Sequence, residues 1–310
     1  MTDYKPEGWL IHTCENRSAT CSLAALQEAM EKETILEARA AVCTTEHDLL
    51  VDLGFCRGRI PRLEGAIGID DGSTRDIALI SRVNKAVCFI VTGFSTDEQG
   101  RLQPILSRKK AQERCRQDFL SKLNSGDILD ARVTHMETFG CFVDIGCGVP
   151  SLIPIDSISV SRIFHPKDRF VNGQDIRVIV RSLDDGGRFT LSHRELLGTW
   201  LENASLFSVG ETVSGIVRSV EDYGIFVELT PNLAGLAEPK AGVEPGQLAS
   251  VYIKNILPEK MKVKLILVDA FDGPSRPAAL HYFYKQKHID RWDYSPPYAP
   301  RQIYSLFGSD

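Results

Sequence analysis

The sequence predicts an all-β protein made of three small five-stranded barrels in tandem. Three observations support this: a set of short strand-like segments occurs three times along the 310 residues, turns rich in glycine or proline separate the segments, and no helical pattern lies inside a set. Parallel α/β sheets need a helix between consecutive strands, so this fold class is excluded. Several short strands at regular spacing are instead typical of small closed barrels.

The three sets share one order of strands. First strands are predicted at residues 34–39, 127–132 and, as a weaker echo, 211–216. Second strands alternate apolar and polar residues, as half-buried strands do, at residues 49–53, 142–145 and 226–229. Short third strands follow at residues 58–61, 151–154 and 235–239. In the second set, the last two strands flank a turn whose Asp and Gly residues suit a hairpin, at residues 184–187.

Helices are predicted before and between the sets. Ser22 is a suitable N-cap for a helix with an apolar stripe at Leu23, Leu26, Ala29 and Met30. Residues 107–123 are expected to form a helix with a dense basic face, and residues 195–201 a shorter connecting helix. Residues 272–277 have the composition of a linker. The tail beyond is rich in aromatic residues, so we expect it to pack on the third barrel or on a partner.

These patterns divide the chain into segments, and a length of 310 residues agrees with more than one domain. The expected segments are an N-terminal helical extension (1–32), a first barrel (33–107), a basic helical linker (108–124), a second barrel (125–194), a helical linker (195–207), a third barrel (208–271) and an aromatic tail (272–310).

Composition narrows the classes of function. The formal net charge is −5, which argues against a strong, unspecific binder of duplex nucleic acid, since such proteins are usually basic. Binding of a single strand through local basic patches and stacking is compatible with this charge. The sequence has no apolar run long enough to span a membrane and no secretory signal, so we expect a cytoplasmic protein that does not contact membranes.

The eight cysteines are scattered and include no C-x-x-C pair. Several lie in apolar strand-like runs, which indicates reduced and buried thiols: Cys43, Cys88 and Cys141. The spacing of His12, Cys14 and Cys21 fits no common zinc site. We therefore expect neither a metal nor a cofactor.

The most informative stretch is residues 137–145, in the second set. Phe139 and Phe142 flank Gly140 and Cys141. In a regular strand, residues three apart point to opposite sides, but a bend or bulge at Gly140 would bring both rings to one exposed surface. Exposed aromatic rings on a small barrel stack on the bases of single-stranded nucleic acid. The competing interpretation is that at least one ring belongs to the barrel core.

On these residues, the second set resembles the S-one-type RNA-binding domain, the OB-fold repeat of the largest RNA-binding protein of the bacterial small ribosomal subunit. The matching motifs are residues 139–145, the glycine-valine turn at 148–149, residues 172–176, and Asp184 followed four positions later by Arg188, before residues 190–192. From about Glu33 to Phe271, the chain is similar to short, three-repeat relatives of that protein in Gram-positive bacteria. The resemblance implies three OB-type barrels and RNA binding.

The third set keeps part of the family pattern. Tyr223 and Phe226 stand where the stacking rings are expected, but Lys262 takes the place of the arginine. The family also carries a histidine on the third strand, whose counterparts here are Pro154 in the second set and Glu238 in the third. The resemblance therefore implies RNA binding that is strongest in the second barrel and weaker in the third.

The first set is the weakest match. It has His47 and Leu50 where aromatic rings are expected, although Asp97 and Arg101 keep the spacing of the acid and the arginine. By resemblance, this barrel is the weakest candidate for RNA binding, and two alternatives stay open: it docks a protein, or it contacts an RNA backbone without aromatic rings through Arg57, Arg59 and Arg62.

The RNA contacts expected from the motifs are stacking rings, cations and one acid: Phe139, Phe142, Arg132, Asp184, Arg188, Tyr223, Phe226 and Lys262. Stacking one base on a ring is worth roughly 1–3 kcal/mol. Arginine offers planar donors that suit phosphates and bases, and Asp184 is expected to orient Arg188 across the turn. The alternative for the charged residues is a surface ion pair of little energetic consequence.

The densest positive patch lies on the predicted basic helix. Its members are expected as possible contacts to an RNA backbone: Arg108, Lys109, Lys110 and Arg114. The alternative is an ordinary solvated helix face.

No catalytic constellation is found in the sequence. The glycine turns at residues 146–148 and 185–187 do not open onto a helix, as a phosphate-cradling loop does. Ser192 and His193 are neighbours in sequence without an arguable third partner. We therefore expect no enzymatic activity.

Two functions remain open at this point. The first is a monomeric protein that binds single-stranded RNA, with mRNA as the expected target, and acts with the small ribosomal subunit or in translation. The second is a protein-interaction adaptor whose barrels and tail dock the ribosome or an RNA-processing enzyme. Salt distinguishes the two, since affinity for RNA falls steeply as the salt concentration rises.

Overall fold

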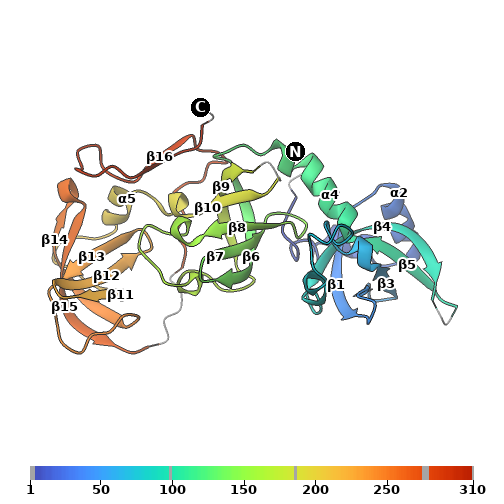
Figure 1. Ribbon diagram of the computed structural model, residues 1–310, viewed down its shortest axis with the longest axis horizontal. Coiled ribbons are helices and arrows are strands. Elements are labelled where there is room, and N and C mark those ends of the chain that lie inside the picture. Colours follow the sequence, from blue (N-terminus) through green and yellow to red (C-terminus); the bar gives the residue numbers. More distant parts are fainter. Residues whose placement is uncertain (1–3, 98–99, 185–186, 274–278, 309–310) are drawn as a thin grey trace. The chain divides into compact units, whose positions relative to one another are not determined.

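The protein consists of three closed five-stranded barrels along the chain, joined by short helices (Figure 1). The computed structural model describes residues 4–97, 100–184, 187–273 and 279–308. The predicted all-β fold of three tandem OB-type barrels is confirmed. Asp185 and Gly186 of the predicted hairpin turn, and residues 274–277 of the predicted linker, lie outside the described residues.

The three barrels have the same strand order, in which the fifth strand lies between the third and the fourth. The strands of the first barrel are β1 (Leu36–Cys43), β2 (Leu49–Asp52), β3 (Arg57–Ile60), β4 (Ala86–Thr96) and β5 (Leu102–Ser107). Those of the second are β6 (Ile128–Glu137), β7 (Gly140–Asp144), β8 (Pro150–Pro154), β9 (Asp175–Leu183) and β10 (Phe189–Ser192). Those of the third are β11 (Thr212–Glu221), β12 (Gly224–Thr230), β13 (Leu233–Ala237), β14 (Leu248–Leu257) and β15 (Lys262–Phe271).

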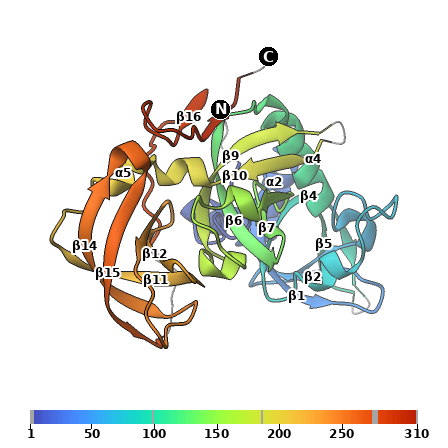
Figure 2. The same cartoon turned by 60° about the vertical axis from the view of Figure 1, so that its left-hand side comes forward.

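A short parallel pairing between the third and fifth strands closes each sheet. The paired residues are Arg59 with Ile105, Leu152 with Thr190, and Leu236 with Lys264. All other pairings given for the barrel strands are antiparallel, and Figure 2 shows the long β14 and β15 of the third barrel side by side. Because successive side chains alternate between the two faces, every second residue fills the barrel interior and the others point outward.

The predicted N-terminal helix is present as α2 (Leu23–Glu31), and the Ser22 side chain accepts a hydrogen bond from the Ala25 N–H at 3.2 Å. Its Leu26 and Ala29 are buried in the core of the first barrel. A shorter helix, α1 (Cys14–Ala19), precedes it and was not anticipated from the sequence. Its N-cap is Thr13, whose hydroxyl accepts from the Asn16 N–H.

The remaining helices lie within and between the barrels. Their bounds are α3 (Ile77–Ile80), α4 (Arg108–Asp118), α5 (Trp200–Ala204), and the 3-10 turns η1 (Arg62–Glu64), η2 (Leu120–Lys122), η3 (Ile155–Ser157), η4 (Pro166–Asp168), η5 (Arg194–Leu197) and η6 (Pro258–Lys260). Helix α4 is the predicted basic helix, and η5 with α5 forms the shorter connection. No helix among the described residues is long and apolar enough to cross a membrane.

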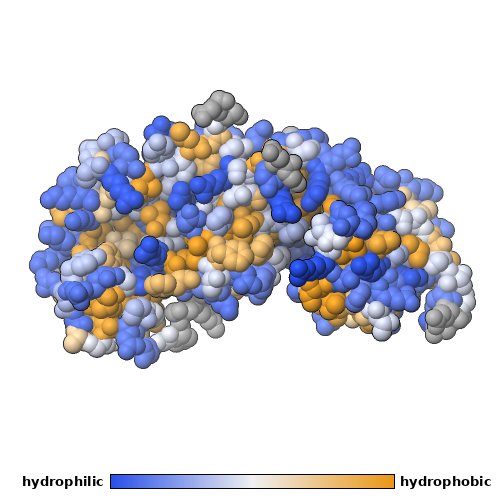
Figure 3. Space-filling view, viewed as in Figure 1, coloured by the Kyte–Doolittle hydropathy of each residue, from blue (hydrophilic) through white to orange (hydrophobic). Residues whose placement is uncertain are grey.

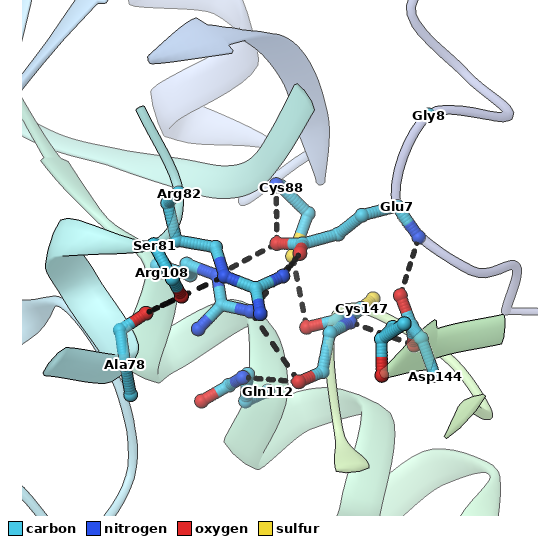
Figure 4. Close-up of polar contacts among 12 residues, drawn as sticks. Glu7, Gly8, Ala78, Ser81, Arg82, Cys88, Arg108, Gln112, Asp144 and Cys147 are labelled. Carbon is cyan, nitrogen blue, oxygen red and sulfur yellow. Dashed lines mark hydrogen bonds and ion pairs between the residues drawn. The ribbon is translucent and has the colours of Figure 1, made fainter. Parts of the chain in front are cut away.

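Packing divides the chain into two compact units, residues 1–123 with 144–150 and residues 124–143 with 151–310. In the first unit, the N-terminal segment is held by the buried carboxylate of Glu7 (Figure 4). Arg108 donates to this carboxylate through Nε at 2.6 Å and Nη2 at 3.0 Å, and the Cys88 N–H donates to it at 3.1 Å. The Glu7 N–H donates to the Asp144 carboxylate at 2.7 Å. One carboxylate thus joins the N-terminal segment to α4 and β4.

A second buried carboxylate, Glu37 of β1, holds the next part of the same segment. It accepts hydrogen bonds from the N–H groups of Gly8, Leu10 and Ile11 at 2.9–3.0 Å. Burial raises the pKa of Glu37 to about 7, and the nearby Glu7 carboxylate adds to the rise. The turn between residues 8 and 11 is therefore organised around a single side chain of the first barrel.

In the second unit, the aromatic tail is part of the fold. Strands β16 (Arg291–Asp293) and β17 (Tyr304–Leu306) pair with each other, and Trp292 and Phe307 are buried in the same apolar cluster as the third-barrel core. The tail also contacts the second barrel, because Ile289 donates to the Gly126 carbonyl at 3.0 Å. The sequence predicted packing on the third barrel or on a partner; the tail packs on both barrels of its own unit.

The cysteines predicted to be buried follow the pattern only in part. Cys88 and Cys141 are buried, whereas Cys43 is half-buried. Cys115 and Cys147 are buried as well, and all eight cysteines are free. Burial raises the pKa of the Cys141 thiol to about 12, so this thiol is unreactive at neutral pH.

Trp292→Ala is expected to lower the free energy of unfolding by about 3–5 kcal/mol, because a large aromatic side chain is removed from a packed cluster. Trp292 is only 1% exposed. Urea denaturation followed by circular dichroism measures the change. The control is Tyr298→Ala in the same tail, where the side chain is 59% exposed and a change within about 0.5 kcal/mol is expected. If Trp292→Ala changed the free energy of unfolding as little as Tyr298→Ala, the tail would not contribute to the stability of the core.

Glu37→Gln tests the buried carboxyl of the first barrel. Its pKa is about 7 in the folded protein against an ordinary value of 4.5, so its stabilising contribution is complete below pH 4.5 and is lost as the pH rises through 7. Between these values, the unfolding free energy of the wild-type protein should fall relative to that of Glu37→Gln. Urea denaturation at several pH values measures the difference, with Glu31→Gln on the exposed side of α2 as the control. Parallel pH profiles would contradict the assignment.

Candidate nucleic-acid interface

The two phenylalanines of the second barrel lie together on its surface. Phe139 is 56% exposed and Phe142 is half-buried, and their ring centroids are 6.0 Å apart in an edge-to-face arrangement. Phe139 belongs to the turn before β7, not to the strand itself, so the alternation of a regular strand does not apply to it. A Cβ at Gly140 would lie 2.5 Å from the Ile153 carbonyl oxygen, so only glycine allows β7 to approach β8 this closely.

The third barrel repeats this arrangement. Tyr223 is 68% exposed in the turn before β12, Phe226 is half-buried, and the ring centroids are 6.1 Å apart, again edge to face. Gly224 takes the place of Gly140, since a Cβ there would lie 2.7 Å from the Ala237 carbonyl oxygen. The same turn and the same close approach therefore place an aromatic pair at equivalent positions of two barrels.

His135 is a member of the second-barrel surface that the sequence analysis missed. Its ring stacks on Phe142 at a centroid distance of 6.4 Å, and its Nε2 lies 2.5 Å from a Glu137 oxygen. The adjacent Thr134 hydroxyl donates to the Phe142 carbonyl at 3.1 Å, which shows that β6 and β7 run side by side here. The sequence signal for His135 was the outward position on β6, but its contact with Phe142 depends on the pairing of the strands.

Lys264 is a second missed residue, on the third barrel. Phe226 pairs with Leu236 on β13, and Leu236 pairs with Lys264 on β15, so the three residues form one row across the barrel. Lys264 is exposed, as is the expected contact Lys262 two residues earlier. Both ammonium groups therefore lie on the strand that borders the aromatic face.

The expected arginine contacts of the second barrel are placed differently from the prediction. Arg132 donates to the two Asp175 oxygens through Nε at 2.7 Å and Nη2 at 2.9 Å, so its guanidinium already has a carboxylate partner. Asp184 accepts a hydrogen bond from the backbone N–H of Arg188 at 2.8 Å. Within the described residues, no ion pair joins Asp184 to the Arg188 guanidinium. Asp184 therefore orders the backbone at Arg188, and its expected role in orienting the Arg188 side chain toward RNA stays a prediction.

The basic face of α4 is smaller than the sequence indicated. Arg108 is 3% exposed and ion-paired with Glu7, which is a correction, since a buried side chain cannot reach an RNA backbone. Lys109 lies 2.9 Å from Asp70. Arg114 donates to the Glu33 carbonyl and lies 3.5 Å from Asp118. Lys110 is exposed. The sequence could not show this, because Glu7 meets Arg108 from 101 positions away.

The first barrel has a groove of about 1170 Å³ instead of an aromatic pair. Its lining includes three arginines and four acids: Arg57, Arg59, Arg101, Glu46, Asp48, Asp52 and Asp97. Arg59 is paired with Asp48 and Arg101 with Asp97, at 2.5 and 2.9 Å. Leu50, where an aromatic ring was expected, pairs with Arg59 across β2 and β3. With four acids against three arginines, the groove has no excess of positive charge that would favour phosphate.

His193 is buried in the second unit, and both of its ring nitrogens lie within hydrogen-bonding distance of other groups of the fold. It is fully buried, its Nδ1 lies 2.9 Å from the Ile158 carbonyl oxygen, and its Nε2 lies 3.2 Å from the Tyr282 hydroxyl of the tail. Burial lowers its pKa to about 4, so the ring is neutral at pH 7. Across the described ranges, no group of three or more His, Cys, Asp or Glu side chains is arranged to hold a metal ion.

Comparison with known proteins shows which proteins the chain is similar to. Residues 122–194, which contain the second barrel, match the S1 RNA binding domain. The small ribosomal subunit protein bS1 of Staphylococcus aureus (strain COL) is 31% identical over 262 residues, covering 79% of this chain and 64% of that protein. The bS1 protein of Leuconostoc lactis is 32% identical over 189 residues, covering 56% of this chain and 44% of that protein.

Residues 122–194 are therefore similar to the S1 RNA binding domain, and most of the chain is similar in sequence to bS1 of Staphylococcus aureus. The chain spans slightly less than two thirds, 64%, of the Staphylococcus relatives' length. A multidomain protein with nucleic acid binding domains from Streptococcus pneumoniae TIGR4 is similar in structure, at 15% identity and a TM-score of 0.26, covering 76% of this chain and 74% of that chain. A TM-score this low supports no conclusion.

Arg108→Met tests the corrected role of Arg108. Burial alone would raise the pKa of Glu7, but the Arg108 guanidinium holds that pKa below its ordinary value. Without Arg108, the Glu7 carboxylate is left buried and poorly paired, so the first unit should lose about 3–5 kcal/mol of stability. Urea denaturation and hydrogen exchange of the β4 amides measure this loss.

The control is Lys110→Met on the exposed side of α4, where a change within about 0.5 kcal/mol is expected. If Arg108→Met left stability unchanged and weakened RNA binding instead, the correction of Arg108 would be wrong.

Proposed function

We propose that the protein is a non-enzymatic, cytoplasmic RNA-binding protein that holds single-stranded RNA, with mRNA as the expected target, and acts with the small ribosomal subunit or in translation. The observation that carries this proposal is the aromatic pair found at equivalent positions of two barrels, with Phe139 and Tyr223 more than half exposed. The chain matches 64% of the length of a Staphylococcus aureus relative that is a small ribosomal subunit protein. This similarity supports the association with the ribosome.

The mechanism follows from the chemistry of the surface. Every base has a π-face, so stacking on exposed rings holds RNA with little sequence preference, at roughly 1–3 kcal/mol per base. Lys262 and Lys264 border the rings of the third barrel and supply charge for the phosphates. Arg188 is exposed at the corresponding end of the second barrel.

Two weak sites in one compact unit bind one strand more tightly than either site alone, because binding at the first raises the effective concentration at the second. The second and third barrels belong to the same unit and share a core with the tail. Such a pair of sites favours RNA long enough to reach both.

The first unit favours a second activity, the docking of a protein. Its groove has charges of both signs and a single aromatic ring, Phe55, in place of an aromatic pair, and three large apolar side chains in the β3–β4 connection are exposed: Leu63, Ile77 and Ile80. This supports the adaptor hypothesis for the first barrel, alongside RNA binding by the other two.

Phe139→Ala with Phe142→Ala should weaken binding of a labelled single-stranded RNA by well over tenfold, since two stacking rings are lost. Fluorescence anisotropy at low and moderate salt measures the affinity, with a duplex of the same sequence for comparison. Wild-type binding should prefer the single strand and weaken as salt rises.

Tyr298→Ala is the matched control, because it removes an exposed ring from the tail. If the Phe139→Ala, Phe142→Ala variant bound the single-stranded RNA with unchanged affinity, these two rings would not be part of the RNA-binding site. No binding of single-stranded RNA by the wild-type protein at micromolar concentration would overturn the proposed function as a whole.

A further inference from the structure

The β8–β9 connection of the second barrel is fixed to the third barrel by a buried ion-pair network. Arg169, 3% exposed, donates through Nη2 to the Glu228 carboxylate of β12 at 2.5 Å and through Nε to the Ser159 hydroxyl at 3.2 Å. Arg218 of β11 donates to the same carboxylate at 2.8 and 3.1 Å. Because removal of either partner would leave a charge buried, this junction holds one geometry.

Asn232, fully buried in the β12–β13 turn, stabilises the same junction between the second and third barrels through hydrogen bonds. Its amide oxygen accepts from the Val160 N–H at 3.0 Å, and its amide nitrogen donates to the Arg194 and Gly198 carbonyls at 2.8 Å each. Its backbone carbonyl accepts from the Tyr294 hydroxyl of the tail at 2.6 Å. The amide is thus bonded to the β8–β9 connection, to η5 and to the residue after it.

The outer side of this connection presents a third exposed aromatic ring. Phe164 is 69% exposed, which is the highest value among the large apolar side chains of the described residues. Arg162 and Lys167, on either side of it in sequence, are exposed as well. The face seen in Figure 3 shows apolar side chains interspersed with hydrophilic ones over the second and third barrels. Proteins that bind single-stranded nucleic acid combine exposed aromatic rings with positive charge, and this connection presents both.

A chain of polar contacts links the Phe164 backbone to β12 of the third barrel. The Asp168 carboxylate accepts from the Phe164 N–H at 3.3 Å and lies 3.6 Å from the Arg218 guanidinium. Arg218 in turn binds Glu228, which follows Phe226 by two positions and so lies on the same outer face of β12. The intervening Val227 fills the core. One carboxylate therefore ties the Phe164 backbone to the edge of the surface that carries Phe226.

We propose that Phe164, Arg162 and Lys167 of the second barrel extend the RNA-binding surface of the third barrel, so that one RNA strand crosses the junction with a base stacked on Phe164. This inference rests on the proposed function. RNA is favoured over a protein partner because the ring is flanked by two cations, while the adjacent acid, Asp168, is engaged with Arg218. The buried network fixes the position of the ring before RNA arrives, which limits the entropy lost on binding.

The test compares Phe164→Ala with the wild-type protein on a short RNA of about 5 nucleotides and a long one of about 16, lengths that bracket the site size of one OB barrel. The long RNA should bind about tenfold more weakly to Phe164→Ala, as expected for the loss of one stacked base, whereas the short RNA, which reaches one aromatic pair only, should change less than threefold. Fluorescence anisotropy measures both affinities, with Tyr298→Ala as the control.

The cations are tested separately. On the long RNA, the double variant Arg162→Ala, Lys167→Ala should reduce the slope of log affinity against log salt by about 0.7 for each phosphate that these two side chains neutralise in the wild-type complex. Arg17→Ala with Arg75→Ala, two exposed cations of the first unit that belong to no expected RNA contact, is the matched control. An unchanged slope would overturn the assignment of these two residues.

The outcomes separate this inference from the proposed function. In one outcome, the wild-type protein binds RNA, the Phe139 and Phe142 substitutions lower the affinity, and Phe164→Ala leaves it unchanged. This outcome overturns the junction site alone and leaves the proposed function in place. If the wild-type protein binds neither RNA, both proposals fall. Loss of affinity for the long RNA alone in Phe164→Ala supports both.

Discussion

A short parallel pairing closes each barrel, and the placement of every candidate contact depends on it. The third and fifth strands meet through one or two residue pairs, such as Leu152 with Thr190 and Leu236 with Lys264. Closure leaves no free edge, so each strand has one face in the interior and one toward solvent. Lys264 stands in line with Phe226 only because β15 runs beside β13, a relation between residues far apart in sequence.

Within this frame, a glycine after a two-residue turn brings two aromatic rings together. The turn carries Phe139 or Tyr223 out of the regular strand, and the following glycine allows the neighbouring strand to approach within a distance that a Cβ would forbid. The rings pair edge to face, a geometry that aromatic side chains prefer, and Phe139 and Tyr223 are more than half exposed. The same local arrangement thus occurs on two barrels of one compact unit.

The burial and the partners of the charged side chains differ from what the sequence indicated. Arg108 belongs to the densest basic run in the chain, yet it is buried, because Glu7 and α4 meet in the fold and a buried charge needs a partner. Asp184 bonds the Arg188 backbone instead of its guanidinium. Short-range sequence patterns report where cations are dense, whereas their availability to a ligand depends on acids that arrive from elsewhere in the chain.

The sequence by itself determined the three barrels and the capped N-terminal helix, since alternation, turn residues and caps act over a few positions; for Phe139 and Phe142 it left a shared surface and a place in the core as alternatives. Only the tertiary structure decided the contact of His135 with Phe142, the buried state of Arg108 and the packing of the tail on two barrels. These features depend on strand register and on contacts across long separations. Phe164 shows the same division: its exposure on a loop is a local property, but its place beside the third barrel is set by the buried contact of Arg169 with Glu228.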